Sequence, residues 1–140
     1  MDRCADAFAH EQWDEVIARC DGEPDRVALA RAHRLRGDGQ AAAATAAAEA
    51  LLTSDVAADA AYLAGYLQAQ DEALATQARG RALLVRALAG FQRAGAHGKA
   101  AKAATYLARV PRPEAHFEDA LRYTRVATDE AALADDDRML

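Results

Sequence analysis

Histidine and acidic residues are the side chains of this sequence that could bind a metal or transfer a proton. Histidine occurs at four positions, which are His10, His33, His97 and His116. No two of them have the H-x-x-x-H or H-E-x-x-H spacing that places two metal ligands on one helical face. Glu114 and His116 are one residue too close for the Glu-x-x-His pairs of di-iron bundles, and no second copy exists. The histidines therefore predict no metal site.

A run of three aspartates, Asp135, Asp136 and Asp137, is the other candidate for a cation site. Like charges in a run repel one another and stay hydrated, which favours a solubilising segment over a magnesium site. No serine or cysteine lies in a nucleophile motif, and no glycine-rich loop follows a predicted strand. We therefore expect a protein that is not an enzyme and that needs no cofactor and no metal.

The two cysteines, Cys4 and Cys20, are too far apart in the sequence for a C-x-x-C redox or zinc motif. The first residues, MDRCADAFAHEQ, lack the basic start and the apolar stretch of a secretory signal. We therefore expect a cytoplasmic protein in which both cysteines are reduced, partly buried thiols. No apolar run approaches the roughly 20 residues of a transmembrane helix, so we expect no contact with membranes.

Alanine dominates the composition of this 140-residue chain, whose length is that of one domain. Hydrophobic residues make up 52% of the sequence, but alanine supplies most of them, so the core must be thin. Alanine is the best helix former, and its small side chain lets helices approach closely. Because β-branched residues are also scarce, the composition predicts an all-α fold of closely packed antiparallel helices.

Apolar periodicity and helix breakers predict where the helices lie. We expect a short helix before a turn at His10–Gln12, and further helices over residues 12–20, 24–37, 40–52, 56–69, 73–94, 99–110 and 114–127. Gly80 would allow a break within 73–94, although one long helix is the preferred interpretation. Pro111 and Pro113 predict a helix stop. In the helix expected over residues 114–127, Leu121 is expected to lie on the apolar face and to point into the core of the protein. Residues 1–127 are expected to form one domain, and residues 128–140 an acidic C-terminal helix or tail.

Two segments carry small or aromatic residues at the positions of a known helical repeat. Within residues 23–56 these are Leu29, Ala30, His33, Gly37 and Ala42, and within 81–114 they are Phe91, Gly95, Ala100 and Ala104. The pattern resembles the tetratricopeptide repeat, a helix-turn-helix unit. Over residues 10–127 the resemblance implies a short right-handed α-solenoid of stacked antiparallel hairpins, with seven or eight helices. A plain helical bundle is the alternative, because alanine-rich helices fill small-residue positions by chance.

The resemblance also implies a function, because such repeats bind a peptide or a partner helix in a groove lined by their first helices. The repeat frame places seven residues near that groove: Arg31, Arg34, Tyr62, Gln68, Arg86, Gln92 and Arg93. Guanidinium groups there would favour a protein partner with acidic groups. The family's clamp of lysine and asparagine for C-terminal tails has no counterpart here. The same arginines could instead be solvated or paired with nearby acids.

Charge is distributed unevenly along the chain. Residues 79–112 contain eight lysines and arginines and no acid, whereas both ends of the chain are acidic. The acidic ends could pack against the basic middle within one molecule or between molecules, so self-association is a further expectation. A basic face could also bind a small ligand or nucleic acid, which makes a helical sensor or regulatory domain the alternative function. The net charge of −5 and the lack of interleaved aromatic residues argue against nucleic acid.

Overall fold

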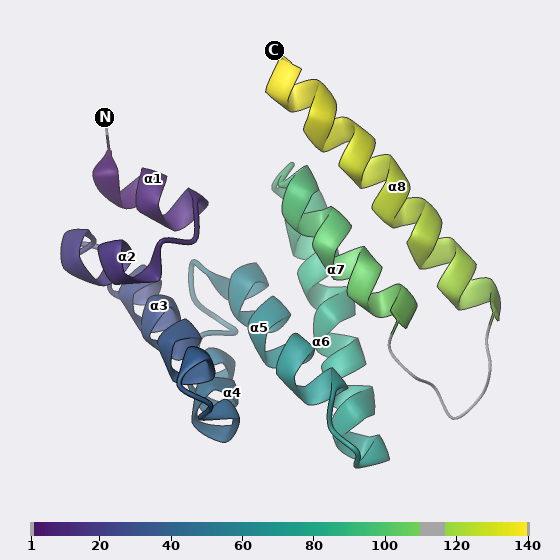
Figure 1. Ribbon diagram of the computed structural model, residues 1–140, viewed down its shortest axis with the longest axis horizontal. Coiled ribbons are helices and arrows are strands. Elements are labelled where there is room, and N and C mark those ends of the chain that lie inside the picture. Colours follow the sequence, from purple (N-terminus) through teal and green to yellow (C-terminus); the bar gives the residue numbers. More distant parts are fainter. Residues whose placement is uncertain (1, 110–116, 140) are drawn as a thin grey trace. The chain divides into compact units, whose positions relative to one another are not determined.

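The computed structural model describes residues 2–109 and 117–139, and these residues form eight α-helices and no strand (Figure 1). The all-α prediction is therefore confirmed for this part of the chain. None of the described helices is long and apolar enough to cross a membrane. The chain divides into two compact units, Met1–Ala64 and Gly65–Leu140, and the boundary falls within one helix, α5 (Ala57–Ala69).

The first unit contains α1 (Arg3–Ala9), α2 (Trp13–Arg19), α3 (Pro24–Gly37), α4 (Ala41–Glu49) and the first part of α5. In this unit α1 packs against α2, α2 against α3, and α3 against α4. The bounds follow local signals: Asp2 caps α1 by accepting a hydrogen bond from the Ala5 amide, Pro24 opens α3, and Gly39 has a φ of 79° in the turn after it. The predicted turn at His10–Gln12 is confirmed, whereas α4 ends three residues before the predicted Leu52.

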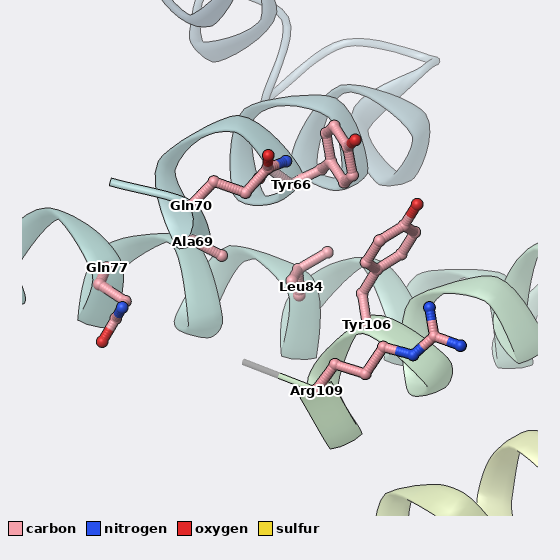
Figure 2. Close-up of a pocket in the computed structure, with 7 residues that line it drawn as sticks. All are labelled: Tyr66, Ala69, Gln70, Gln77, Leu84, Tyr106 and Arg109. Atoms are coloured by element: carbon pink, nitrogen blue, oxygen red, sulfur yellow. The ribbon is translucent and has the colours of Figure 1, made fainter. Parts of the chain in front are cut away.

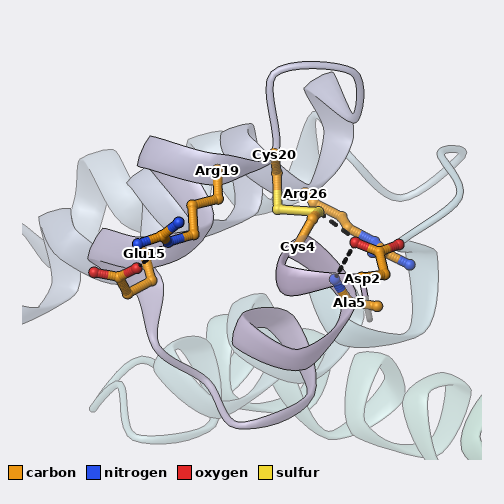
Figure 3. Close-up of a disulfide and its surroundings, with 7 residues drawn as sticks. All are labelled: Asp2, Cys4, Ala5, Glu15, Arg19, Cys20 and Arg26. Carbon is orange, nitrogen blue, oxygen red and sulfur yellow. Dashed lines mark hydrogen bonds and ion pairs between the residues drawn. A yellow bond between two sulfur atoms is a disulfide. The ribbon is translucent and has the colours of Figure 1, made fainter.

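The core of the first unit is built around a disulfide bond between Cys4 and Cys20 (Figure 3). Both cysteines are buried, and the two Cα atoms are 5.0 Å apart. The bond joins the start of α1 to the residue that follows α2. Our expectation of two reduced thiols is therefore wrong for this structure. The Arg26 guanidinium donates a hydrogen bond to Cys4 Sγ at 3.5 Å and lies over the Phe8 ring.

An aromatic stack completes this core. The Trp13 and His33 rings lie face to face, with centroids 4.0 Å apart and planes 7° apart, and the Phe8 ring meets Trp13 edge-on. Because Trp13 opens α2 and His33 lies in α3, the stack joins two helices that differ in direction. Phe8 and Trp13 are partly buried against the core, where stacked and edge-on rings add stabilisation that small alanine side chains cannot give.

The second unit contains the rest of α5, together with α6 (Leu74–Arg93), α7 (His97–Arg109) and α8 (Phe117–Met139). α6 packs against α7, and α7 packs against α8. The interpretation of residues 73–94 as one long helix is confirmed, and Gly80 lies buried within it. The turn from α6 to α7 uses Gly95, which has a φ of 69°.

Gly80 lies where α5 and α6 approach each other closely. A Cβ atom added to Gly80 would lie 2.7 Å from the Cα atom of Ala69, and one added to Gly65 would lie 2.9 Å from the Gly80 carbonyl oxygen. Both distances are too short for real contacts, so the two helices meet backbone to backbone. This is the geometry that small residues permit and larger ones prevent.

The last helix is longer than the sequence suggested. α8 continues without a break to Met139, so residues 128–139, expected to be an acidic helix or tail, extend this helix. It buries Tyr123 and Glu130, whereas Leu121 is 58% exposed, so the prediction that Leu121 faces the core is wrong. The predicted stop at Pro111–Pro113 and the predicted helix start at Glu114 lie outside the described residues.

Candidate binding surfaces

A cavity of about 330 Å³ lies within the second unit (Figure 2). Three helices line it: α5 with Tyr66, Ala69 and Gln70, α6 with Gln77 and Leu84, and α7 with Tyr106 and Arg109. The cavity is open to solvent on one side, and most of its lining is apolar. It is therefore a pocket that a small group could enter, and not a sealed void.

Helical spacing explains why these side chains converge. Tyr66 and Gln70 are four residues apart on α5, and Tyr106 and Arg109 are three apart on α7, so each pair shares one helical face. Gln77 and Leu84 are two turns apart on α6, so the lining extends about 10.5 Å along that helix. The Tyr66 and Tyr106 rings meet edge-on with centroids 4.8 Å apart, and they fix the distance between α5 and α7.

The chemistry of the pocket combines an apolar floor with a few polar groups. Leu84 is fully buried and Ala69 is 5% exposed, so together they form a hydrocarbon surface. Tyrosine hydroxyl groups and glutamine amides can donate or accept hydrogen bonds around it. Among the described lining residues, the exposed Arg109 is the charged one, and none of them carries a carboxylate. The pocket is therefore suited to a ligand that is mostly apolar and carries a negative charge.

A second surface is a line of arginines along the exposed side of α6. Arg79, Arg86 and Arg93 follow one another at intervals of seven residues, and all three are exposed. Two helical turns are close to seven residues, so the three side chains leave the helix on one face. The buried residues Leu84, Leu88 and Phe91 lie on the other side of α6. We call Arg79, Arg86 and Arg93 the arginine line.

The residues predicted to bind a partner fall in both units. In the first unit, Arg31 is exposed on α3, Tyr62 is half-buried on α5, and the Arg34 Nε atom lies 3.4 Å from Asp14 Oδ1. Arg34 therefore has an acidic neighbour within its own unit, although both side chains of this pair are largely exposed. Such a pair contributes little to stability and leaves the guanidinium accessible to solvent.

In the second unit the structure separates the remaining predicted residues by environment. Arg86 and Arg93 are both exposed and belong to the arginine line. Gln68 is 8% exposed and lies in the packed crossing of α5 and α6. Gln92 donates a hydrogen bond from Nε2 to Glu130 Oε1 at 3.0 Å. The structure thus brings two of these four residues together on one accessible face.

Glu130 forms a polar cluster at the end of α6. This residue is 7% exposed, and besides the bond from Gln92 its Oε2 atom lies 2.6 Å from His97 Nδ1. Gln92 comes from the last turn of α6, and His97 opens α7. The Glu130 carboxylate of α8 therefore contacts both α6 and α7. We interpret the cluster as a structural contact that holds α8 against the end of α6.

The sequence analysis did not identify any of the five polar or aromatic residues named in the pocket lining, which are Tyr66, Gln70, Gln77, Tyr106 and Arg109. Each has an ordinary position on an amphipathic helix, and the sequence contains no signal for which helices meet. The spacing of Arg79, Arg86 and Arg93, in contrast, can be read from the sequence, because intervals of seven residues place side chains on one helical face.

Within residues 2–109 and 117–139, no group of three or more histidine, cysteine or acidic side chains could hold a metal ion. Comparisons with protein-family models, with curated proteins and with solved structures found no match. The resemblance to the tetratricopeptide repeat therefore stays a prediction, and the case for a function rests on the two surfaces.

Proposed function

We propose that this chain is a non-enzymatic protein-interaction module with a tetratricopeptide-like solenoid fold. The packing of α1 to α4, and of α6 to α8, each helix against the next, supports this fold, because stacked hairpins bury their apolar faces against their neighbours in sequence. In the proposal, the partner supplies a peptide or a helix with acidic groups. A cytoplasmic location is part of the same proposal. The Cys4–Cys20 bond is an argument against this location, since disulfides are rare in reducing compartments.

The arginine line is the observation that carries this proposal. Its members are about 10.5 Å apart along α6, from a rise of 1.5 Å per residue. An α-helix laid alongside α6 would present carboxylates at the same separation if acidic residues recurred every seven positions. The partner with the best complementarity is therefore a helix with one acidic stripe.

The strength of such a complex follows from the exposure of the arginines. An exposed ion pair contributes about 0.2–1 kcal/mol, so three pairs contribute roughly 1–3 kcal/mol. Even millimolar affinity requires about 4 kcal/mol. The charges therefore affect the orientation of the partner and the association rate more than they affect the affinity. Val85, which is 41% exposed next to Arg86, offers an apolar contact on the same helix. The proposed complex is thus a weak, salt-sensitive one.

Two synthetic helical peptides of the same composition test this function. One carries glutamates every seven residues, and the other carries the same glutamates distributed around the helix. Fluorescence anisotropy should give tighter binding for the first peptide, with affinity falling as salt rises. The double variant Arg86→Glu, Arg93→Glu should abolish the difference between the peptides. The control variant Lys102→Glu, Arg125→Glu makes the same change in net charge at exposed positions on α7 and α8.

The outcomes separate the alternatives. Equal affinity for both peptides, or an equal loss in the control variant, would show that net charge alone attracts the peptide and would refute the arginine line. Tighter binding of a DNA or RNA oligonucleotide than of either peptide would favour the nucleic-acid alternative. Retention of normal helicity by circular dichroism is required for each variant.

A further inference from the structure

The pocket of the second unit is too small for the partner helix proposed above. An α-helix is about 10 Å wide with its side chains, whereas the pocket has a volume of about 330 Å³. Small-molecule sites usually have volumes of roughly 300–1,000 Å³. The pocket lies at the lower end of that range and matches a compact organic molecule. The ligand that fits this pocket is therefore a small molecule and not the partner helix.

The lining restricts the chemistry of that ligand. Leu84 and Ala69 provide an apolar floor, and their side chains offer no hydrogen bond, so this floor favours an apolar group of the ligand. The edges and faces of Tyr66 and Tyr106 can pack against a hydrocarbon chain or an aromatic ring. The lining extends about 10.5 Å along α6 between Leu84 and Gln77, which is long enough for a short chain that lies along this helix.

The charge of the lining is positive. Arg109 is at the end of α7, and in Figure 2 its side chain extends in the direction of Tyr106, at the opposite end of the view from Gln77. None of the described residues of the lining is acidic, so among them an amine would find no counter-charge. A guanidinium group binds a carboxylate with two parallel hydrogen bonds.

We propose that this pocket binds a small, elongated apolar monocarboxylate, with its hydrocarbon part on Leu84 and Ala69 and its carboxylate on Arg109. The hydrocarbon part is either an aliphatic chain or an aryl-alkyl group, and the shared chemistry is one carboxylate on a slim apolar body. This site is separate from the arginine line, so the two proposals stand or fall independently.

Calorimetric titration of the full chain with matched probes tests the site. Octanoate is compared with octan-1-ol and octylamine, and 4-phenylbutyrate with 4-phenylbutan-1-ol. Each carboxylate should bind saturably and about tenfold more tightly than its alcohol, and the amine should bind least. The ratio of the dissociation constants of octanoate and 4-phenylbutyrate shows whether the pocket prefers an aliphatic chain or an aryl-alkyl group. Backbone amide shifts in NMR spectra should change most around Tyr66, Leu84 and Tyr106.

Variants assign the charge contact to one residue. Arg109→Gln should bring the affinity for the carboxylate close to that for the alcohol, and Arg109→Lys should restore part of the difference. Arg125→Gln, which removes an exposed arginine from α8, is the matched control and should leave the affinity unchanged. Because Arg109 is exposed, its replacement should not disturb the packing of α7.

Several results would overturn the proposal. The first two are equal affinity for the carboxylate and its alcohol, and a loss of carboxylate affinity in Arg125→Gln as large as that in Arg109→Gln. The others are amide shifts that lie outside the pocket, and no saturable binding of any probe at millimolar concentration. The double variant Arg86→Glu, Arg93→Glu should still bind octanoate, which separates a failure of this pocket from a failure of the arginine line.

Discussion

Gly80 and Ala69 hold α5 and α6 in direct backbone contact, because a Cβ atom on Gly80 would lie 2.7 Å from the Ala69 Cα atom. Gly80 is in the middle of a long helix, where alanine would ordinarily be favoured by about 1 kcal/mol. The close packing of α5 and α6 therefore requires glycine at position 80, although glycine has a low helix propensity. The pocket depends on the same contact, since Ala69 lines it.

The variant Gly80→Ala tests this close approach. The new methyl group must push α5 away, which should lower the free energy of unfolding by about 1–3 kcal/mol despite the better helix propensity. Urea unfolding followed by circular dichroism measures the change. Gly98→Ala is the control, because a Cβ atom at Gly98 in α7 meets nothing within 4 Å. It should be neutral or stabilise the protein slightly, and an unchanged stability of Gly80→Ala would contradict the contact.

The variant Glu130→Ala tests the structural contact between α8 and the end of α6. It removes the acceptor for Gln92 and the partner of His97 in a buried site, which should cost about 1–3 kcal/mol. Amide hydrogen exchange should accelerate in α8 before it accelerates in α6. Asp129→Ala, at the exposed neighbouring position, should have little effect. Equal exchange rates in both variants would mean that apolar contacts alone hold α8.

The double variant Cys4→Ser, Cys20→Ser tests the disulfide bond. The bond closes a loop across 16 positions of sequence, and its loss should cost roughly 3 kcal/mol on the loop-entropy model. Hydrogen exchange should then rise most in α1, which is only seven residues long. Reduction of the native protein with dithiothreitol should have the same effect. Alkylation of two thiols in protein purified without reductant would show that the bond is not formed.

The variant His33→Ala tests the stack on Trp13. The stack should contribute about 0.5–1.5 kcal/mol, and its loss would expose one face of the indole ring to water. Because Trp13 is the single tryptophan of the sequence, its emission spectrum reports this directly and should shift to longer wavelength. His10→Ala, at an exposed position after α1, should leave the emission unchanged. An unchanged spectrum for His33→Ala would contradict the stacked geometry.

Local signals made most helix bounds predictable from the sequence. Pro24 opens α3, and the positive φ values at Gly39 and Gly95 fall in turns that end α3 and α6. α8 was predicted too short, because Asp135–Asp137 suggested a solvated tail. The helix continues to Met139, and three alanines, the strongest helix formers, directly precede these acids at positions 131, 132 and 134.

The contacts between helices were much less predictable. Leu121 was assigned to the core from its hydrophobicity, but the face of α8 that packs is the one that carries Tyr123 and Glu130. The disulfide had a signal that could have been used, since Cys4 and Cys20 are each eight residues from Gln12 in the turn between α1 and α2. An antiparallel hairpin brings such equidistant residues together. The pocket had no comparable signal, because it needs the relative positions of three helices.

The Cys4–Cys20 bond has a practical consequence for labelling. With both cysteines of the sequence in one buried bond, the oxidised protein offers no free thiol to a maleimide dye. A single cysteine introduced on the surface of α7 would then be the sole attachment point for a fluorophore or a spin label. Distances from that label to a labelled peptide could follow binding along α6 without any change to the native cysteines.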